Sequence, residues 1–321
     1  MNAKGIKANS ENIKHSRISI SSLKWSIGFV LLILMLVESG RGTDYVRQGF
    51  SICVKSVLPV LFPFALMSAL ICQTEPPELL ARPLCRFFGI SIKGVSALFS
   101  GLLSGFPVGA MAVGSLYKRG DIGKNEAERL LCFTNNPSCA FTVGVVGSVV
   151  LGSGTLGALL FIILTAVSVV TGRILMLLCK GKADEEYECA NTIHRKATFS
   201  QAVGSTALSM LNVSGFIVAF SVVTGYLRQM SRPLGETIST LLCGIAELSN
   251  GVLSLTDACL SPQMKFILCG AFCAFSGCCV HMQVSSALAD SDISMKKYFV
   301  SKAAGAVATT FICLVISPLL F

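Results

Sequence analysis

Long apolar runs separated by short polar stretches make up most of this 321-residue chain. Nine runs are candidates for membrane segments: 25–38, 48–72, 92–116, 130–151, 155–179, 203–227, 238–255, 264–288 and 298–321. Most are close to the ~20 residues that a helix needs to cross a bilayer. Runs such as LGALLFIILTAVSVV, at 156–170, lack the alternation of membrane strands. The pattern therefore predicts an all-α fold.

Two of these runs contain residues that interrupt helices. The run at 92–116 holds Gly101, Gly105, Pro107 and Gly109, and the run at 238–255 holds Gly244, Asn250 and Gly251. Irregular backbone at membrane depth is tolerated only where it is buried in protein or lines a cavity, because lipid offers no hydrogen bonds. We therefore predict that both runs form re-entrant hairpins around a polar chamber.

Composition excludes a soluble domain. The chain is 53% hydrophobic and 13% charged, with a mean hydropathy of +0.71, whereas soluble domains have about 25% charged residues. The lipid bilayer is thus an expected partner, in a multi-pass protein of the cell membrane. The net charge of +9 is explained by a basic tail and basic loops near anionic lipid, and nucleic acid is not an expected partner.

The N-terminal region predicts a tail and an anchor. Residues 1–22 are polar and basic, which is typical of a disordered cytoplasmic tail. The short apolar run within 23–40 also resembles a signal peptide, but Glu38, Ser39, Gly40 and Arg41 follow it without a small-residue cleavage site. We expect a retained anchor helix.

Positive charges predict the orientation of the chain. By the positive-inside rule, the N-terminus is cytoplasmic because its basic residues are Lys4, Lys7, Lys14, Arg17 and Lys24. If all nine runs crossed the membrane, two basic loops would face outside and contradict that rule. These loops contain Lys118, Arg119, Lys124 and Arg129 in the first case and Lys180, Lys182, Arg195 and Lys196 in the second.

The contradiction disappears if each interrupted run enters and leaves the membrane on one side. Both loops then lie inside, together with Lys296, Lys297 and Lys302. The outside keeps only Arg41, Arg47, Arg228, Arg232 and Lys265. This arrangement has about seven spanning helices plus two re-entrant hairpins, which fall at corresponding places in two halves, 48–179 and 203–321. Each half crosses an odd number of times, so we predict an inverted repeat, an architecture of transporters.

The residue-level support for this repeat is thin. Gly101 corresponds to Gly244 at one offset, and Phe133-Thr134 to Phe275-Ser276 at nearly the same offset. Chance matches in a membrane protein rich in Leu, Ser and Gly explain such pairs equally well, so the repeat rests on topology rather than on identity.

Asn135 and Asn136 are a candidate solute or ion site. Pro137 follows them, and proline removes a backbone donor and disfavours helix in the preceding residue. We expect an unwound turn there, which joins the hairpin residues Gly105, Phe106, Pro107 and Gly109 as candidate substrate-binding elements. The alternative is that the two amides only hold neighbouring helices together.

Glu247 is the acidic residue placed well inside an apolar run. An ionised carboxylate there costs at least ~2.5 kcal/mol on insertion scales, so it is paired, protonated or in contact with water. Two alternatives remain: a coupling role, or a structural pair with Lys55, which could instead snorkel to the interface. Asn250 is a further candidate of the same hairpin, and Asn212, His281 and Gln283 are weaker substrate-binding candidates.

Other chemistry has no visible motif. The 14 cysteines lack ligand spacing, and nucleotide-binding loops and hydrolase motifs are missing. We therefore expect no metal, no cofactor, no catalytic residue and no enzyme. In YKRGDIGKNEAERLL, Gly123 is expected to cap a helix with Glu126 at its third position, as in a capping box without the hydroxyl.

These residues make the sequence similar to a known family. The matching motifs are SGFPVGA, LYKRGDIGKNEAERLLCFTNNP, NVSGFIVAFSVV (212–223), AELSNG (246–251) and FSGCCVHMQV (275–284). From about residue 45 to 321, the chain resembles the YlbJ-type sporulation integral membrane proteins of endospore formers, within the nucleoside-recognition or Gate domain group. It departs from them at Gly123, where serine is the common cap.

The resemblance implies a function. It implies a membrane protein made during sporulation and associated with passage of dipicolinic acid across the outer forespore membrane. Dipicolinate carries two carboxylates, which suit the N–H groups of broken helices; Lys55 or His281 could add positive charge. Two other functions stay open: transport of nucleosides or other small anions, and a structural role without transport. A homo-oligomer also stays open.

Overall fold

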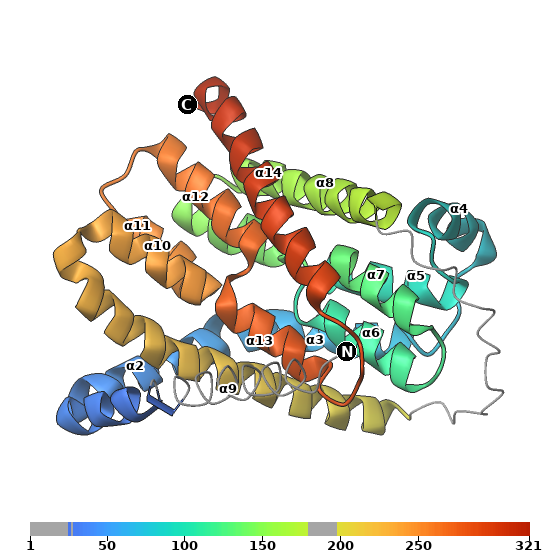
Figure 1. The fold of residues 1–321 in the computed structure, drawn as a ribbon, viewed down its shortest axis with the longest axis horizontal. Helices are drawn as coiled ribbons and strands as arrows, with labels where there is room; N and C mark the ends of the chain where they lie inside the picture. The colour runs from blue at the N-terminus through green and yellow to red at the C-terminus, as the bar shows by residue number, and fades with distance from the viewer. Residues whose placement is uncertain (1–24, 27, 179–197) are drawn as a thin grey trace, which may run out of the picture.

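The computed structural model describes residues 25, 26, 28–178 and 198–321, and nearly all of them lie in helices (Figure 1). The prediction of an all-α fold is thus confirmed. The expected tail at 1–22 and the loop cations Lys180, Lys182, Arg195 and Lys196 lie outside the described residues.

The first part of the chain consists of short helices before one long one. In order they are a short helix at Gly28–Val37, α2 (Ser39–Ile52), the π-helix η1 (Cys53–Val57), α3 (Leu58–Ile71), α4 (Glu78–Phe88), α5 (Ile92–Ser104), α6 (Val108–Lys118), α7 (Lys124–Thr134), the π-helix η2 (Phe141–Val150) and α8 (Gly154–Leu178).

The second part begins and ends with long helices. It contains α9 (Phe199–Ser231), the 3₁₀ turn η3 (Arg232–Leu234), α10 (Glu236–Ala246), α11 (Leu248–Asp257), α12 (Pro262–Phe275), α13 (Gly277–Ala287) and α14 (Lys296–Leu320). Helix α14 crosses the face of the molecule seen in Figure 1 and packs on α12, α8 and α7.

Four helical segments among the described residues are long and apolar enough to cross a membrane: Gly154–Leu175, Phe199–Leu234, Pro262–Ala287 and Lys296–Leu320. Two bent pairs raise the number to six if each counts as one span. These are Ser39–Val57 with Leu61–Ile71, bent by 57°, and Glu78–Phe88 with Ile92–Ser104, bent by 85°. The chain is therefore a multi-pass integral membrane protein with four to six candidate spans.

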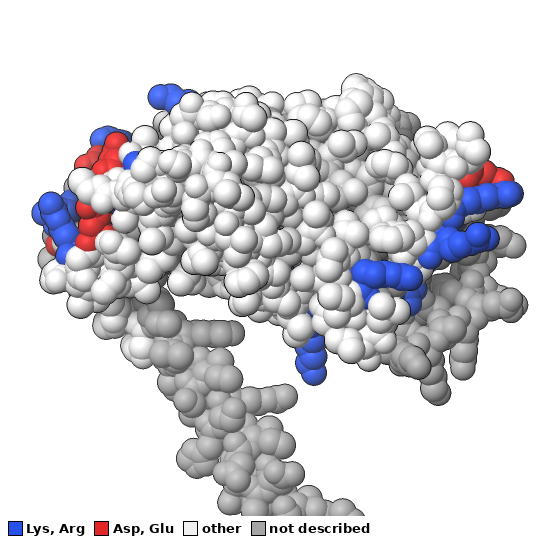
Figure 2. Space-filling view, turned by 90° about the horizontal axis from the view of Figure 1, so that it is seen from above, with Lys and Arg blue, Asp and Glu red and all other residues white. Residues whose placement is uncertain are grey.

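The surface fits a lipid environment. Figure 2 shows most of the visible charged side chains at the two ends of the long axis, with a largely uncharged surface between them. Large apolar side chains are exposed on the long helices, among them Leu208 and Leu211 of α9 and Phe311 and Leu314 of α14. Soluble monomers rarely expose so much contiguous apolar surface, so we assign this belt to lipid contact.

Besides the two interrupted runs, three other predicted runs are not continuous α-helices. The run at 48–72 passes through the π-helix η1, and the run at 130–151 is split into α7 and η2 around Asn135 to Ser138. The run at 264–288 is split at Ser276, which has a positive φ of 76°. Only the second break was expected from the sequence, because Pro137 marks it and no proline marks Ser276.

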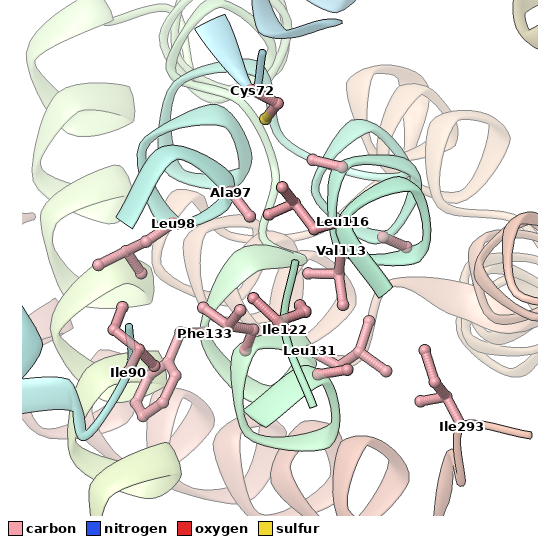
Figure 3. Close-up of a cluster of buried hydrophobic side chains, with 14 of the residues drawn as sticks. Cys72, Ile90, Ala97, Leu98, Val113, Leu116, Ile122, Leu131, Phe133 and Ile293 are labelled. Atoms are coloured by element: carbon pink, nitrogen blue, oxygen red, sulfur yellow. The ribbon is translucent and has the colours of Figure 1, made fainter. Parts of the chain in front are cut away.

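A buried apolar cluster fixes the first hairpin in place. Leu98 of α5, Val113 and Leu116 of α6, and Leu131 and Phe133 of α7 point toward one another in Figure 3. Each of these side chains is at most 2% exposed. The hairpin α5–α6 is therefore packed against α7 along its length.

Loops distant in sequence meet at the two ends of the molecule. At one end, Lys118 pairs with Asp290 at 2.9 Å and Lys124 with Asp292 at 2.8 Å. At the other end, Gln229 donates to Glu38 at 3.0 Å. The loops around residues 118–124 and 290–292 therefore share one end, and the start of α2 and the end of α9 share another.

Candidate functional site

The first hairpin turns at Gly105, Phe106 and Pro107, between α5 and α6, with a cis peptide bond before the proline. The N–H of Phe106 donates to the Asn136 carbonyl at 2.9 Å. A Cβ built on Gly109 would fall well inside contact distance of the Thr134 carbonyl, and the same holds for Gly101. Glycine is needed on both arms so that the hairpin can close on the end of α7.

Asn135 joins the ends of two helices through one amide. Its Oδ1 accepts from the Ala110 N–H at 3.0 Å, near the start of α6, and its Nδ2 donates to the Leu131 carbonyl at 3.2 Å, in the last turn of α7. The side chain is fully buried. Asn135 thus satisfies a donor and an acceptor that both helix ends leave unpaired.

Asn136 lies against a buried lysine. Its Nδ2 donates to the Phe133 carbonyl at 3.0 Å, and its Oδ1 accepts from Lys302 Nζ at 3.1 Å. Lys302 Nζ also donates to the Asn135 carbonyl, and Lys302 is only 6% exposed. Lys302, which was expected on the cytoplasmic side, is thus a buried residue of α14, which begins at Lys296.

Glu247 is the whole connection between α10 and α11. Its carboxylate accepts from the N–H groups of Ser249 at 2.9 Å and Asn250 at 2.6 Å, and it is 2% exposed. Carboxylates stabilise helix N-termini by such bonds and by the helix dipole. Glu247 therefore caps α11 inside the protein.

The second hairpin closes like the first. A Cβ on Gly251 would overlap the Gly244 backbone, and a Cβ on Gly244 would overlap the Phe272 ring. Asn250 is 7% exposed and donates to Ser221 Oγ at 3.3 Å. Both interrupted runs are thus helix-turn-helix hairpins that glycines hold in close contact.

The remaining predicted residues lie in separate places. Lys55 is exposed, and no ion pair joins it to Glu247 among the described residues. Asn212 is exposed and donates to Ser286, His281 Nδ1 lies 3.0 Å from the Tyr298 hydroxyl, and Gln283 donates to Cys279 Sγ at 3.3 Å. Among the described residues, none of these four side chains has a hydrogen bond with Asn135 or Asn136, but His281 lies close enough to Lys302, which binds both asparagines, for an electrostatic interaction.

The two hairpin tips contact shared buried clusters. Phe106, in the first tip, packs against the cluster that contains Leu248, in the second. Val108 belongs to a cluster with Cys53 and Cys279. Cys279 follows the Ser276 break by three residues, so both tips lie in the interior.

A cavity of about 710 Å³ lies between α3, α6 and α9. It extends from Val108, beside the first hairpin tip, to the charged residues Glu75, Lys93, Arg119 and Asp121. Hydroxyl groups contribute to its wall: Ser68, Thr74, Ser115, Ser205, Thr206 and Ser209. None of the site residues predicted from the sequence lines it.

The charges of this cavity are linked to each other. Asp121 accepts from Lys93 at 2.7 Å and from Arg119 at 2.7 Å, and Arg119 also donates to the Cys72 carbonyl at 2.8 Å. Burial by itself raises the pKa of Asp121, but the hydrogen bonds from Lys93 and Arg119 outweigh it and lower that pKa. Asp121 is therefore ionised at neutral pH and holds both cations at the cavity.

Sequence reasoning missed the residues that form this cavity, and it missed Lys302. The sequence contained a signal for Lys302 and another for the cavity. Lys302 lies inside the apolar run 298–321, and Ser205 and Ser209 are four residues apart on the apolar helix α9. As expected, Gly123 is the N-cap of α7 and Glu126 lies in its first turn. Glu126 also accepts from the Ser91 N–H at 2.6 Å, a contact that the sequence did not predict.

Comparison with known proteins gives one informative match. No family model matches the chain, and no solved structure matches it. The sporulation integral membrane protein YlbJ of Bacillus subtilis (strain 168) is 26% identical over 85% of this chain and 77% of its own length. The chain is therefore a multi-pass integral membrane protein and a homologue of this sporulation protein.

Proposed function

We propose that the chain is a transporter or facilitator that moves a small anionic solute across a membrane during sporulation. The observation that carries the proposal is the 710 Å³ cavity, which extends from a group of charged residues, Glu75, Lys93, Arg119 and Asp121, to the tip of the first hairpin. Solute pockets commonly have volumes of about 300–1,000 Å³.

The proposed topology is an inverted repeat with both hairpins re-entrant and the N-terminus cytoplasmic. The ion pair of Lys118 with Asp290 supports it, because these loops would lie on opposite sides if all nine runs crossed. The bond between Gln229 and Glu38 supports it in the same way at the other end. In this arrangement the cavity opens toward the cytoplasm.

The order of elements supports two related halves. Each half consists of a first helix, a hairpin closed by glycines, a broken helix and a final long helix. In the first half these are α3, α5–α6, α7–η2 and α8; in the second they are α9, α10–α11, α12–α13 and α14. Two halves with meeting hairpins provide a natural route for alternating access.

Dipicolinate is our expected cargo. Its two carboxylates match Lys93 and Arg119, and its ring nitrogen and oxygens match the hydroxyl groups of α6 and α9. The choice of dipicolinate over other anions rests on the family resemblance, as does the outer forespore membrane as the location. Transport of nucleosides or other small anions is the second candidate, because the polar wall of the cavity suits them too.

The hairpin donors do not face a solute in this conformation. The N–H of Phe106 donates to the Asn136 carbonyl, and the N–H of Ala110 donates to Asn135 Oδ1. We propose that solute binds first in the cavity and that movement of the first hairpin away from Asn135 and Asn136 frees those donors. No enzymatic step is part of this proposal.

Uptake into proteoliposomes tests the function. Labelled dipicolinate and labelled nucleosides are offered to purified protein, to Arg119→Gln and to the cavity-filling variant Ser209→Phe. We expect dipicolinate uptake by the wild type and roughly tenfold less in both variants, since losing one charged contact costs about 1.4 kcal/mol or more. Arg82→Gln removes an exposed arginine of α4 and is the matched control.

The other outcomes discriminate the alternatives. If the protein takes up nucleosides but no dipicolinate, nucleosides replace dipicolinate as the proposed cargo. Absence of any uptake by folded protein would favour a structural role, for which Asn135→Ala would leave both spore dipicolinate and protein abundance unchanged.

A further inference from the structure

Lys302 is a buried cation with no carboxylate partner among the described residues. Its Nζ donates to the Asn135 carbonyl and to Asn136 Oδ1. The neighbouring lysine Lys297 differs, because it pairs with Glu128 at 3.0 Å. An ionisable side chain inside a membrane protein is costly, so its retention indicates a function.

The oxygens around Lys302 belong to the negative end of a helix. Helix α7 ends at Thr134, so its last carbonyls lack helical partners. Side chains satisfy several of them: Thr134 Oγ1 donates to Leu130, Asn135 to Leu131, and Ser168 to Cys132. The Asn135 carbonyl, just beyond the helix, is left to Lys302. The site therefore combines oxygen ligands with the partial negative charge of a helix C-terminus.

A small cavity adjoins the ammonium group. It has a volume of about 10 Å³, and its wall includes Lys302, Asn136, Ser301 and Thr309. Thr309 is fully buried, and its hydroxyl has no hydrogen-bond partner among the described residues. About one water-sized particle fits such a volume.

We propose that the Lys302 ammonium occupies a site for a monovalent metal cation of the Na⁺ class. Carbonyl and amide oxygens at an unwound helix are ligands that hard cations of this kind use in broken-helix membrane proteins. In the native chain a tethered cation fills this site, so the break after α7 needs no bound Na⁺. The inference holds for any cargo and does not depend on the proposed function.

A purely structural lysine would make a different prediction. If Lys302 only fills space and links α14 to α7, its removal lowers the melting temperature by the same amount in every salt. If it stands in for a metal cation, shortening it vacates a set of oxygen ligands that Na⁺ can occupy. The response to Na⁺ therefore separates the two roles.

Thermal unfolding of the purified full-length protein provides the test. Wild type, Lys302→Ala and Lys302→Met are melted in NaCl, in KCl and in choline chloride at equal ionic strength. We expect the wild type to melt at the same temperature in all three salts. Lys302→Ala is expected to melt at least about 3 °C higher in NaCl than in choline chloride, because a ligand bound to the folded state raises its stability.

Lys302→Met is the matched control. Its side chain keeps most of the volume of lysine without the charge, so it fills the site and is expected to show no preference for Na⁺. An Na⁺-dependent melting temperature in the wild type would overturn the inference. A Lys302→Ala protein that is equally stable in all salts, or that fails to fold in every one of them, would overturn it as well.

Discussion

The two broken regions of the molecule use the same architecture with opposite charges. In the first, the hairpin α5–α6 closes on the end of α7, and the Lys302 ammonium binds the oxygens of Asn135 and Asn136. In the second, the hairpin α10–α11 turns at Glu247, whose carboxylate binds the N–H groups that begin α11. Each buried charge is thus stabilised by backbone and amide groups.

The difference follows from the direction of the helix dipole. A helix C-terminus attracts cations and a helix N-terminus attracts anions. Lys302 lies at the end of α7 and Glu247 at the start of α11, so both charges have the favourable sign. The comparison shows that the end of a broken helix can offset the cost of burying an isolated charge. A helix C-terminus favours a buried cation, and a helix N-terminus favours a buried anion.

The largest expected effect comes from the glycines that close the hairpins. Gly109→Ala in the first and Gly251→Ala in the second each bring a methyl group onto backbone atoms. We expect each to lower the free energy of unfolding by about 3 kcal/mol, since overpacking that displaces backbone has this magnitude. Denaturant unfolding of the protein in detergent measures it.

Gly204→Ala and Gly215→Ala are the controls, because a Cβ at either helical position meets no atom within 4 Å. These variants are expected to be unchanged or up to about 1 kcal/mol more stable. If Gly109→Ala proved as stable as the controls, the first hairpin would not be packed against Thr134.

A smaller effect is expected at the carboxylate. Glu247→Gln keeps one acceptor and turns an amide NH₂ toward the N–H of Ser249 or Asn250. We expect a loss of about 2 kcal/mol, the cost of one hydrogen bond to a charged group. Thermal unfolding in NaCl and in choline chloride should give the same loss, unlike that of Lys302→Ala.

Glu236→Gln is the matched control because Glu236 begins α10 and is exposed. Its expected effect is below about 1 kcal/mol. A loss at Glu247 that matched the loss at Glu236 would mean that the buried cap contributes little to the second hairpin.

The smallest effect concerns the loops that join the halves. Hydrogen bonds with Lys118 lower the pKa of Asp290, and those with Lys124 and Tyr117 lower the pKa of Asp292. A lowered carboxyl pKa gives stability that is present above the unfolded-state pKa and is lost as the pH falls through the folded-state pKa. The contribution should therefore disappear below about pH 4.

The measurement compares melting temperatures of the wild type and an Asp290→Asn, Asp292→Asn double variant across pH. A small difference is expected at pH 7 that vanishes by about pH 3 and shrinks in 1 M salt. A difference that persisted in acid would assign the effect to packing.

Some features of the fold and the site were readable from the residue pattern. Helices, both hairpins and the break at Asn135 were predicted because glycine, proline and asparagine act locally on backbone geometry. The break at Ser276 was missed although Gly277, which has a positive φ of 72°, follows it, because a single glycine within an apolar run is weaker evidence of a break than several glycines with a proline or an asparagine. Whether the hairpins re-enter the membrane remains a prediction.

The amino-acid sequence by itself determined that this protein is helical and embedded in lipid, because apolar content and local helix-breaking residues act within a few positions of each other. Only the tertiary structure decided where its buried charges bind. Lys302 meets Asn136 across 166 positions, and the cavity needs α3, α6 and α9 together. Such contacts depend on how helices pack in three dimensions, which a periodic pattern along one segment does not encode.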